Sequence, residues 1–119
     1  MRDISILKSN GFDIDSVFET FGEIEVYEEI LTDFYNQAKE RGLKIIECIK
    51  NGDLKNYAII VHSIKGECLY LGINKLADMS YEQQLKAEEN DMQFIKAHFN
   101  EYIEEFTRIL NTIKKYYGK

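Results

Sequence analysis

Hydrophobic residues recur at helical spacing along most of the sequence. Between residues 24 and 50 they return every three, four or seven positions, which is the repeat of one face of an α-helix. This stripe consists of Tyr27, Leu31, Phe34, Ala38, Ile45 and Ile49. Gly42 falls in phase within its widest gap, so the pattern predicts one helix over residues 24–50, with Gly42 as a kink or a close-packing point.

Glycine, asparagine and aspartate mark the ends of the other long helices. Gly52 suits the left-handed position after a helix, and Asp53 can accept a backbone N–H at the start of the next one. Gly72 repeats the first signal, and Asn90-Asp91 repeats both. The helices that these residues separate are predicted over 54–71, 74–89 and 92–117.

A short helix is predicted before the long ones, because Asp15 can cap it and Gly22 can end it. Its hydrophobic residues are Val17, Phe18 and Phe21. Short links between long amphipathic helices make neighbouring helices antiparallel. Residues 1–119 are therefore expected to form one all-α domain, an up-and-down antiparallel four-helix bundle with a short additional N-terminal helix.

Composition fits a folded helical domain and argues against several partners. The sequence contains no proline, which folds built from many strands and turns normally use. The formal net charge of −6 provides no basic surface, so we expect no nucleic acid and no membrane surface as a partner. The apolar run in residues 1–11 is too short for a signal peptide or a membrane span. We therefore expect a cytoplasmic protein, and a monomer.

The segment VHSIKGECLYLG, residues 61–72, places a histidine on the outer side of a predicted helix. At about 100° per residue, His62 points away from the stripe that faces the other helices. That stripe consists of Tyr57, Val61, Ile64, Cys68 and Leu71. The outer side that His62 shares is mostly small or apolar, and comprises Lys55, Ala58, Ile59, Gly66 and Leu69. A solvated helix face would normally carry Glu and Lys, so this surface indicates docking of another molecule, to which Ala58, Ile59 and Leu69 would contribute.

Gly66 and Lys65 give the histidine a chemical context. Glycine costs a helix about 1 kcal/mol relative to alanine, and here it would leave room for a backbone or a phosphate to approach the ring. Neutral imidazole can attack phosphorus and release the phosphoryl group again. Lys65 lies on an adjacent ridge, where its ammonium can neutralise phosphate oxygens. The sequence contains no glycine-rich phosphate loop and no serine-hydrolase pattern.

The segment HSIKG at residues 62–66, with Leu71-Gly72 at the helix end, resembles the motif of histidine-containing phosphotransfer (HPt) domains. The resemblance extends over FDIDSVFETFGEIEVYEEILTDFY, NGDLKNYAIIVHSIKG and QLKAEEND, and so covers most of the chain. It implies a helical bundle whose histidine receives a phosphoryl group from the aspartate of one receiver domain and passes it to another. The implied partners are receiver domains of response regulators or hybrid histidine kinases.

The resemblance also implies roles for individual residues. His62 would carry the phosphoryl group, Lys65 would stabilise it, and Gln84 would hold a ring nitrogen. Gln83 could take the place of Gln84 if its helix were rotated. Glu67 departs from the small residues usual at this position and would add negative charge near the site. The protein would need no cofactor of its own, because the receiver supplies the aspartate and Mg²⁺.

Two other readings remain open. A metal-binding bundle would use Glu-x-x-His pairs, but isoleucines stand three residues before both His62 and His98. Cys68 and His62 diverge by about a third of a turn on one helix, which argues against a zinc site, and we expect both cysteines to be packed thiols and His98 to be structural. The second reading is an adaptor that binds receiver-like partners through the same surface without phosphotransfer.

Overall fold

The computed structural model describes residues 2–118, which form six helices and no strand. In chain order these are α1 (Ser5–Ser9), α2 (Ile14–Phe21), α3 (Ile24–Asn51), α4 (Leu54–Leu71), α5 (Asn74–Glu88) and α6 (Met92–Tyr116). The predicted all-α class is confirmed for this part of the chain. None of these helices is both long enough and apolar enough to cross a membrane.

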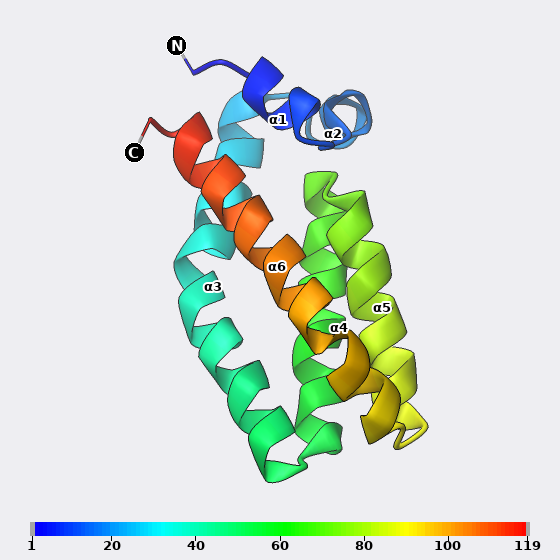
Figure 1. Cartoon of the computed structure of the whole chain (residues 1–119). Helices are drawn as coiled ribbons and strands as arrows, with labels where there is room; N and C mark the ends of the chain where they lie inside the picture. Colours follow the sequence, from blue (N-terminus) through cyan, green and yellow to red (C-terminus); the bar gives the residue numbers. More distant parts are fainter. Residues whose placement is uncertain (1, 119) are drawn as a thin grey trace.

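The four longer helices pack on one another in sequence order. α3 packs on α4, α4 on α5, α5 on α6, and α6 returns to α3 (Figure 1). The contact between α4 and α5 is the most extensive of these. α1 and α2 lie at one end of the longer helices, where α1 contacts α6, and α2 contacts α3 and α4. The helix that carries His62 is therefore held by α2, α3 and α5.

The predicted caps of the long helices are confirmed. The Asp53 side chain accepts a hydrogen bond from the backbone N–H of Asn56, and the Asp91 side chain accepts one from Phe94. Gly52 and Gly72 adopt left-handed backbone conformations, with φ of 70° and 75°. These residues end α3 and α4 where the sequence predicted.

The N-terminal region differs from the sequence prediction in two ways. The cap of α2 is Asp13, whose side chain accepts the backbone N–H of Ser16, and Asp15 lies in the first turn. The cap residue bonds to an N–H two or three positions along, and Asp13 has this spacing to Ser16. The structure also contains α1, which was not predicted because five residues are too few to establish a helical repeat. Buried Leu7 anchors α1 to the core.

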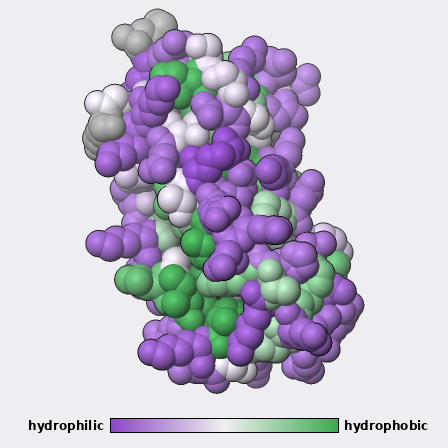
Figure 2. Space-filling model, in the orientation of Figure 1, coloured by the Kyte–Doolittle hydropathy of each residue, from purple (hydrophilic) through white to green (hydrophobic). Residues whose placement is uncertain are grey.

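The predicted stripe of α4 is confirmed as core. Its five residues, Tyr57, Val61, Ile64, Cys68 and Leu71, are all fully buried. α3 continues through Gly42, where an added Cβ would make an ordinary 4.0 Å contact with the Phe106 ring. The packing at Gly42 would therefore accept an alanine. The face of the molecule shown in Figure 2 is mostly hydrophilic, with hydrophobic residues gathered mainly in its lower half and a smaller group near its top.

The C-terminal end of α4 is held by hydrogen bonds from the N-terminal region and from α3. The N–H of Asp13 donates to the Gly72 carbonyl over 2.8 Å, and the Tyr27 hydroxyl donates to the Leu71 carbonyl over 2.8 Å. A Cβ added to Gly72 would lie 2.8 Å from the Asp13 carbonyl oxygen, whereas a Cβ on Gly52 would meet open space. Gly52 and Gly72 thus share a left-handed backbone, but only Gly72 is closely packed against another segment.

We predict that Gly72→Ala lowers the free energy of unfolding by about 3 kcal/mol, because strain in the left-handed region adds to overlap with backbone. Gly52→Ala is the matched control and should cost only about 1 kcal/mol, since only the backbone strain remains. Denaturant unfolding followed by circular dichroism measures both values. Equal losses in the two variants would contradict the close packing of α2 on Gly72.

Candidate functional site

His62 lies on the exposed side of α4, beside a glutamine from α5. Its Nδ1 is 3.1 Å from Oε1 of Gln84. An amide oxygen only accepts hydrogen bonds, so this contact, with the Gln84 amide oriented as in the structure, requires the ring proton on Nδ1. The lone pair of the neutral ring is then on Nε2. The arrangement thus selects Nε2 as the nucleophilic nitrogen.

The two glutamines that the sequence left as alternatives occupy different environments. Gln84 is half-buried and contacts His62. Gln83 is only 2% exposed and accepts a hydrogen bond from the hydroxyl of Tyr57, inside the core between α4 and α5. Gln84 is therefore the residue that can orient the ring.

Lys65 lies one turn beyond His62 and leans towards α5. Its Nζ is 4.8 Å from the centroid of the Tyr81 ring, a cation–π distance worth about 0.5–1 kcal/mol at an exposed site. Lys65 and Tyr81 line a shallow groove of about 270 Å³, together with Leu69, Ala77 and Asp78. Sequence reasoning missed Tyr81, although its position three residues before Gln84 put it on the same side of α5.

The outer side of α4 is open and apolar around the histidine. Ile59 and Leu69 are 57% and 56% exposed, whereas Ala58 is partly buried. A Cβ added to Gly66 would meet nothing within 4 Å. The fold therefore does not require a glycine at position 66. We call this surface the His62 face and define it by Ile59, His62, Gly66 and Leu69.

Glu67 lies on the other flank of α4. Its carboxylate forms an ion pair with Arg41 of α3, and both side chains are partly buried. Gln84 reaches His62 from α5, so the ion pair and the ring contact involve opposite neighbours of α4. The negative charge that the sequence suggested near His62 is thus paired with a cation on the α3 side.

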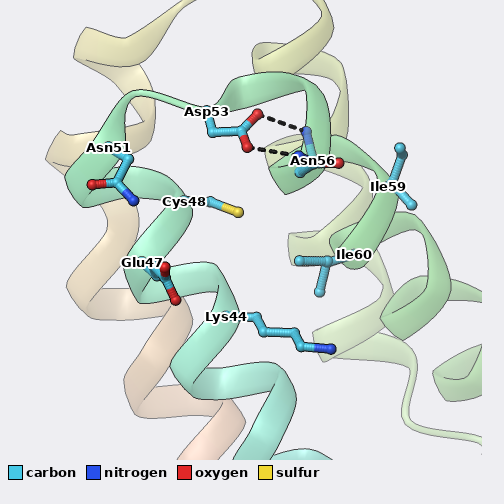
Figure 3. Close-up of a pocket in the computed structure, with 8 residues that line it drawn as sticks. All are labelled: Lys44, Glu47, Cys48, Asn51, Asp53, Asn56, Ile59 and Ile60. Carbon is cyan, nitrogen blue, oxygen red and sulfur yellow. Dashed lines mark hydrogen bonds between the residues drawn. The ribbon is translucent and has the colours of Figure 1, made fainter.

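A larger hollow of about 340 Å³ lies between the end of α3 and the start of α4 (Figure 3). Its lining includes Cys48, Asp53 and Ile59, but not His62. The Asp53 carboxylate is used by Asn56 as the helix cap, and burial raises the pKa of the Cys48 thiol, which favours the unreactive protonated form. Only Ile59 connects this hollow to the His62 face.

The other candidate residues, the two cysteines and His98, pack against other parts of the protein. Cys48 and Cys68 are free and buried, and desolvation also raises the pKa of the Cys68 thiol. The ring of His98 stacks on Phe94 with centroids 4.2 Å apart, and its Nδ1 is 3.6 Å from the Glu101 carboxylate. Within residues 2–118, no three His, Cys, Asp or Glu side chains converge as ligands of a metal ion would.

No protein-family model, curated protein or solved structure matches this chain. The likeness to HPt domains therefore rests on the residues of the sequence itself.

We predict that Gly66→Ala raises the free energy of unfolding by about 0.5–1 kcal/mol, because alanine is the better helix former and its methyl group meets open space. Gly42→Ala in α3 is the control, and we expect the protein to tolerate this change as well. Denaturant unfolding measures both variants. A loss of stability in Gly66→Ala would mean that the fold needs this glycine, and would remove the reason to assign it to access.

Proposed function

We propose that this protein is a phosphorelay intermediate of the HPt type. His62 accepts a phosphoryl group from the aspartate of one receiver domain and donates it to the aspartate of another. The observation that carries this proposal is the exposed imidazole with Gln84 at its Nδ1 and Lys65 one turn along. The resemblance of residues 62–66 to the HPt motif supports the same reaction.

The proposed transfer is a nucleophilic displacement at phosphorus. The Nε2 lone pair forms the N–P bond while the P–O bond to the receiver aspartate breaks, and the aspartate leaves as a carboxylate. The ring becomes cationic in this step because Nδ1 keeps its proton, and the oxygen of Gln84 accepts a hydrogen bond from that N–H. Lys65 lies where its ammonium can reach the transferred phosphoryl oxygens, and the receiver brings Mg²⁺.

The proposed scaffold is an up-and-down antiparallel bundle of α3, α4, α5 and α6. The packing of each of these helices on the next, and of α6 on α3, supports this arrangement. Such a bundle holds the ring at a fixed point of a rigid surface, so that little entropy is lost when a receiver docks. The His62 face, with partly buried Ala58, would meet the receiver, and the protein itself would act as a cytoplasmic monomer.

Phosphotransfer from an isotopically labelled receiver domain tests the proposal. The wild-type protein should acquire an acid-labile, base-stable label, and His62→Gln should acquire none, because the amide cannot act as the nucleophile. His98→Gln is the matched control, since His98 is the second of the two histidines in the chain, and it should retain the label. Panels of receivers from the same genome identify the partner.

Two results would contradict the relay. Label retained by His62→Gln would place the phosphoryl group elsewhere. Equally tight receiver binding by the wild type and His62→Gln, with no label in either, would establish the adaptor, for which the exposed Ile59 and Leu69 suffice.

A second prediction concerns the cation. Lys65→Ala should slow phosphotransfer about tenfold while leaving helicity unchanged, because one charge that neutralises the phosphoryl oxygens is lost. Lys114→Ala is the control, since it removes the same charge from an exposed position on α6, outside the outer side of α4. Stopped-flow or rapid-quench transfer rates compare the two variants. Equal rates in the two variants would mean that Lys65 affects transfer only through the net charge of the protein.

A further inference from the structure

The rotation of α5 about its own axis decides which side chain meets His62. Gln83 and Gln84 are chemically identical neighbours, about 100° apart around the helix. Oε1 of Gln84 is 3.1 Å from Nδ1 of His62, whereas Gln83 is buried between α5 and α4. The buried stripe of α5 excludes a rotation by a whole residue. A smaller rotation would still move Gln84 away from the ring, so a directional contact is needed to hold it there.

The buried hydrogen bond between Tyr57 and Gln83 has this property. Tyr57 is fully buried on α4 and donates its hydroxyl to Oε1 of Gln83. Desolvation raises the pKa of Tyr57, which keeps the hydroxyl protonated and able to donate. This bond joins α4 to α5, the same two helices that the contact between Gln84 and His62 joins.

The hydrogen bond between Tyr57 and Gln83 differs from the apolar contacts between α4 and α5 because it is directional. The apolar residues of α5 that pack in the core, Leu76, Ala77 and Ala87, make contacts that tolerate small rotations. A hydrogen bond weakens steeply when its angle departs from linearity, and a buried polar group left unpaired carries its full desolvation cost. Rotation of α5 would break the bond and leave both Tyr57 and Gln83 unpaired in the core.

We propose that Tyr57 and Gln83 are positioning residues that set the rotation of α5 and thereby hold Gln84 at Nδ1 of His62. Through Gln84 they keep the ring proton on Nδ1 and the nucleophilic lone pair on Nε2. Their importance for phosphotransfer rests on the proposed function, but their effect on the ring is present without any partner.

The tautomer of His62 provides a readout that a merely structural role would not move. In ¹⁵N-labelled protein, at a pH where the ring is neutral, the imidazole nitrogen shifts report the ratio of Nδ1–H to Nε2–H. We expect this ratio to fall about fivefold in Tyr57→Phe, as for the loss of one hydrogen bond at the ring. Gln84→Leu removes the contact directly and defines the end point.

The matched control is Tyr27→Phe. Tyr27 is also fully buried, and its hydroxyl donates to the Leu71 carbonyl of α4 over 2.8 Å, but this bond does not involve α5. The control variant should therefore lower the free energy of unfolding without changing the ratio of the two His62 tautomers. The double variant Tyr57→Phe with Gln83→Met removes both polar groups, so stability should recover while the altered ratio remains.

Three outcomes would overturn the assignment: an unchanged ratio in Tyr57→Phe, an equal change in Tyr27→Phe, or a wild-type ratio in the double variant. None of them depends on phosphotransfer. Failure of the wild type to accept label would refute the relay and leave this test intact, whereas an unchanged ratio would refute the positioning role and leave the relay intact.

Discussion

The packing of α4 against α5 underlies every feature of the candidate site. The buried stripe of α4 attaches that helix to its neighbours, and its contact with α5 is the most extensive in the molecule. This contact brings Gln84 to the ring of His62 and Tyr81 to the ammonium of Lys65, although each pair is separated by many residues in the chain. The chemistry of the exposed side thus depends on packing of the buried side.

α4 carries apolar residues on its outer side as well as on its inner side. The inner residues are accounted for by the core, but exposed Ile59 and Leu69 bury little surface within the molecule. Exposed apolar surface of this kind is consistent with a site that another protein covers. The ion pair between Glu67 and Arg41 keeps a carboxylate on the α3 side of α4. In the proposed reaction, an approaching phosphoryl group would therefore meet Lys65 before it met this negative charge.

The N-terminal region gives α4 a fixed end. α2 closes over Gly72, and Tyr27 of α3 bonds to the Leu71 carbonyl, so the last turn of α4 is held by two other helices. Asp53 caps the opposite end. A histidine midway between two secured ends has little freedom to move with its helix, as the proposed phosphotransfer would require.

Sequence alone determined the five helices from α2 to α6 and the exposure of His62. Gly52, Asp53 and Gly72 act on backbone within a few residues of themselves, so their signals can be read without knowledge of the fold. The sequence was less informative where the local signal was short, as in α1. It was also less informative at the start of α2, where the cap is Asp13 and not Asp15. The stripe of α4 also required only helical periodicity.

Only the tertiary structure decided which glutamine meets the ring, that Tyr81 supports Lys65, and that Glu67 turns towards Arg41. Each of these depends on how one helix is rotated against another. That rotation is set by side chains about twenty or more residues apart, such as Tyr57 and Gln83, whose pairing leaves no periodic trace in the sequence. Periodicity specifies which face of a helix is buried, whereas directional contacts inside the core select the neighbour at each exposed position.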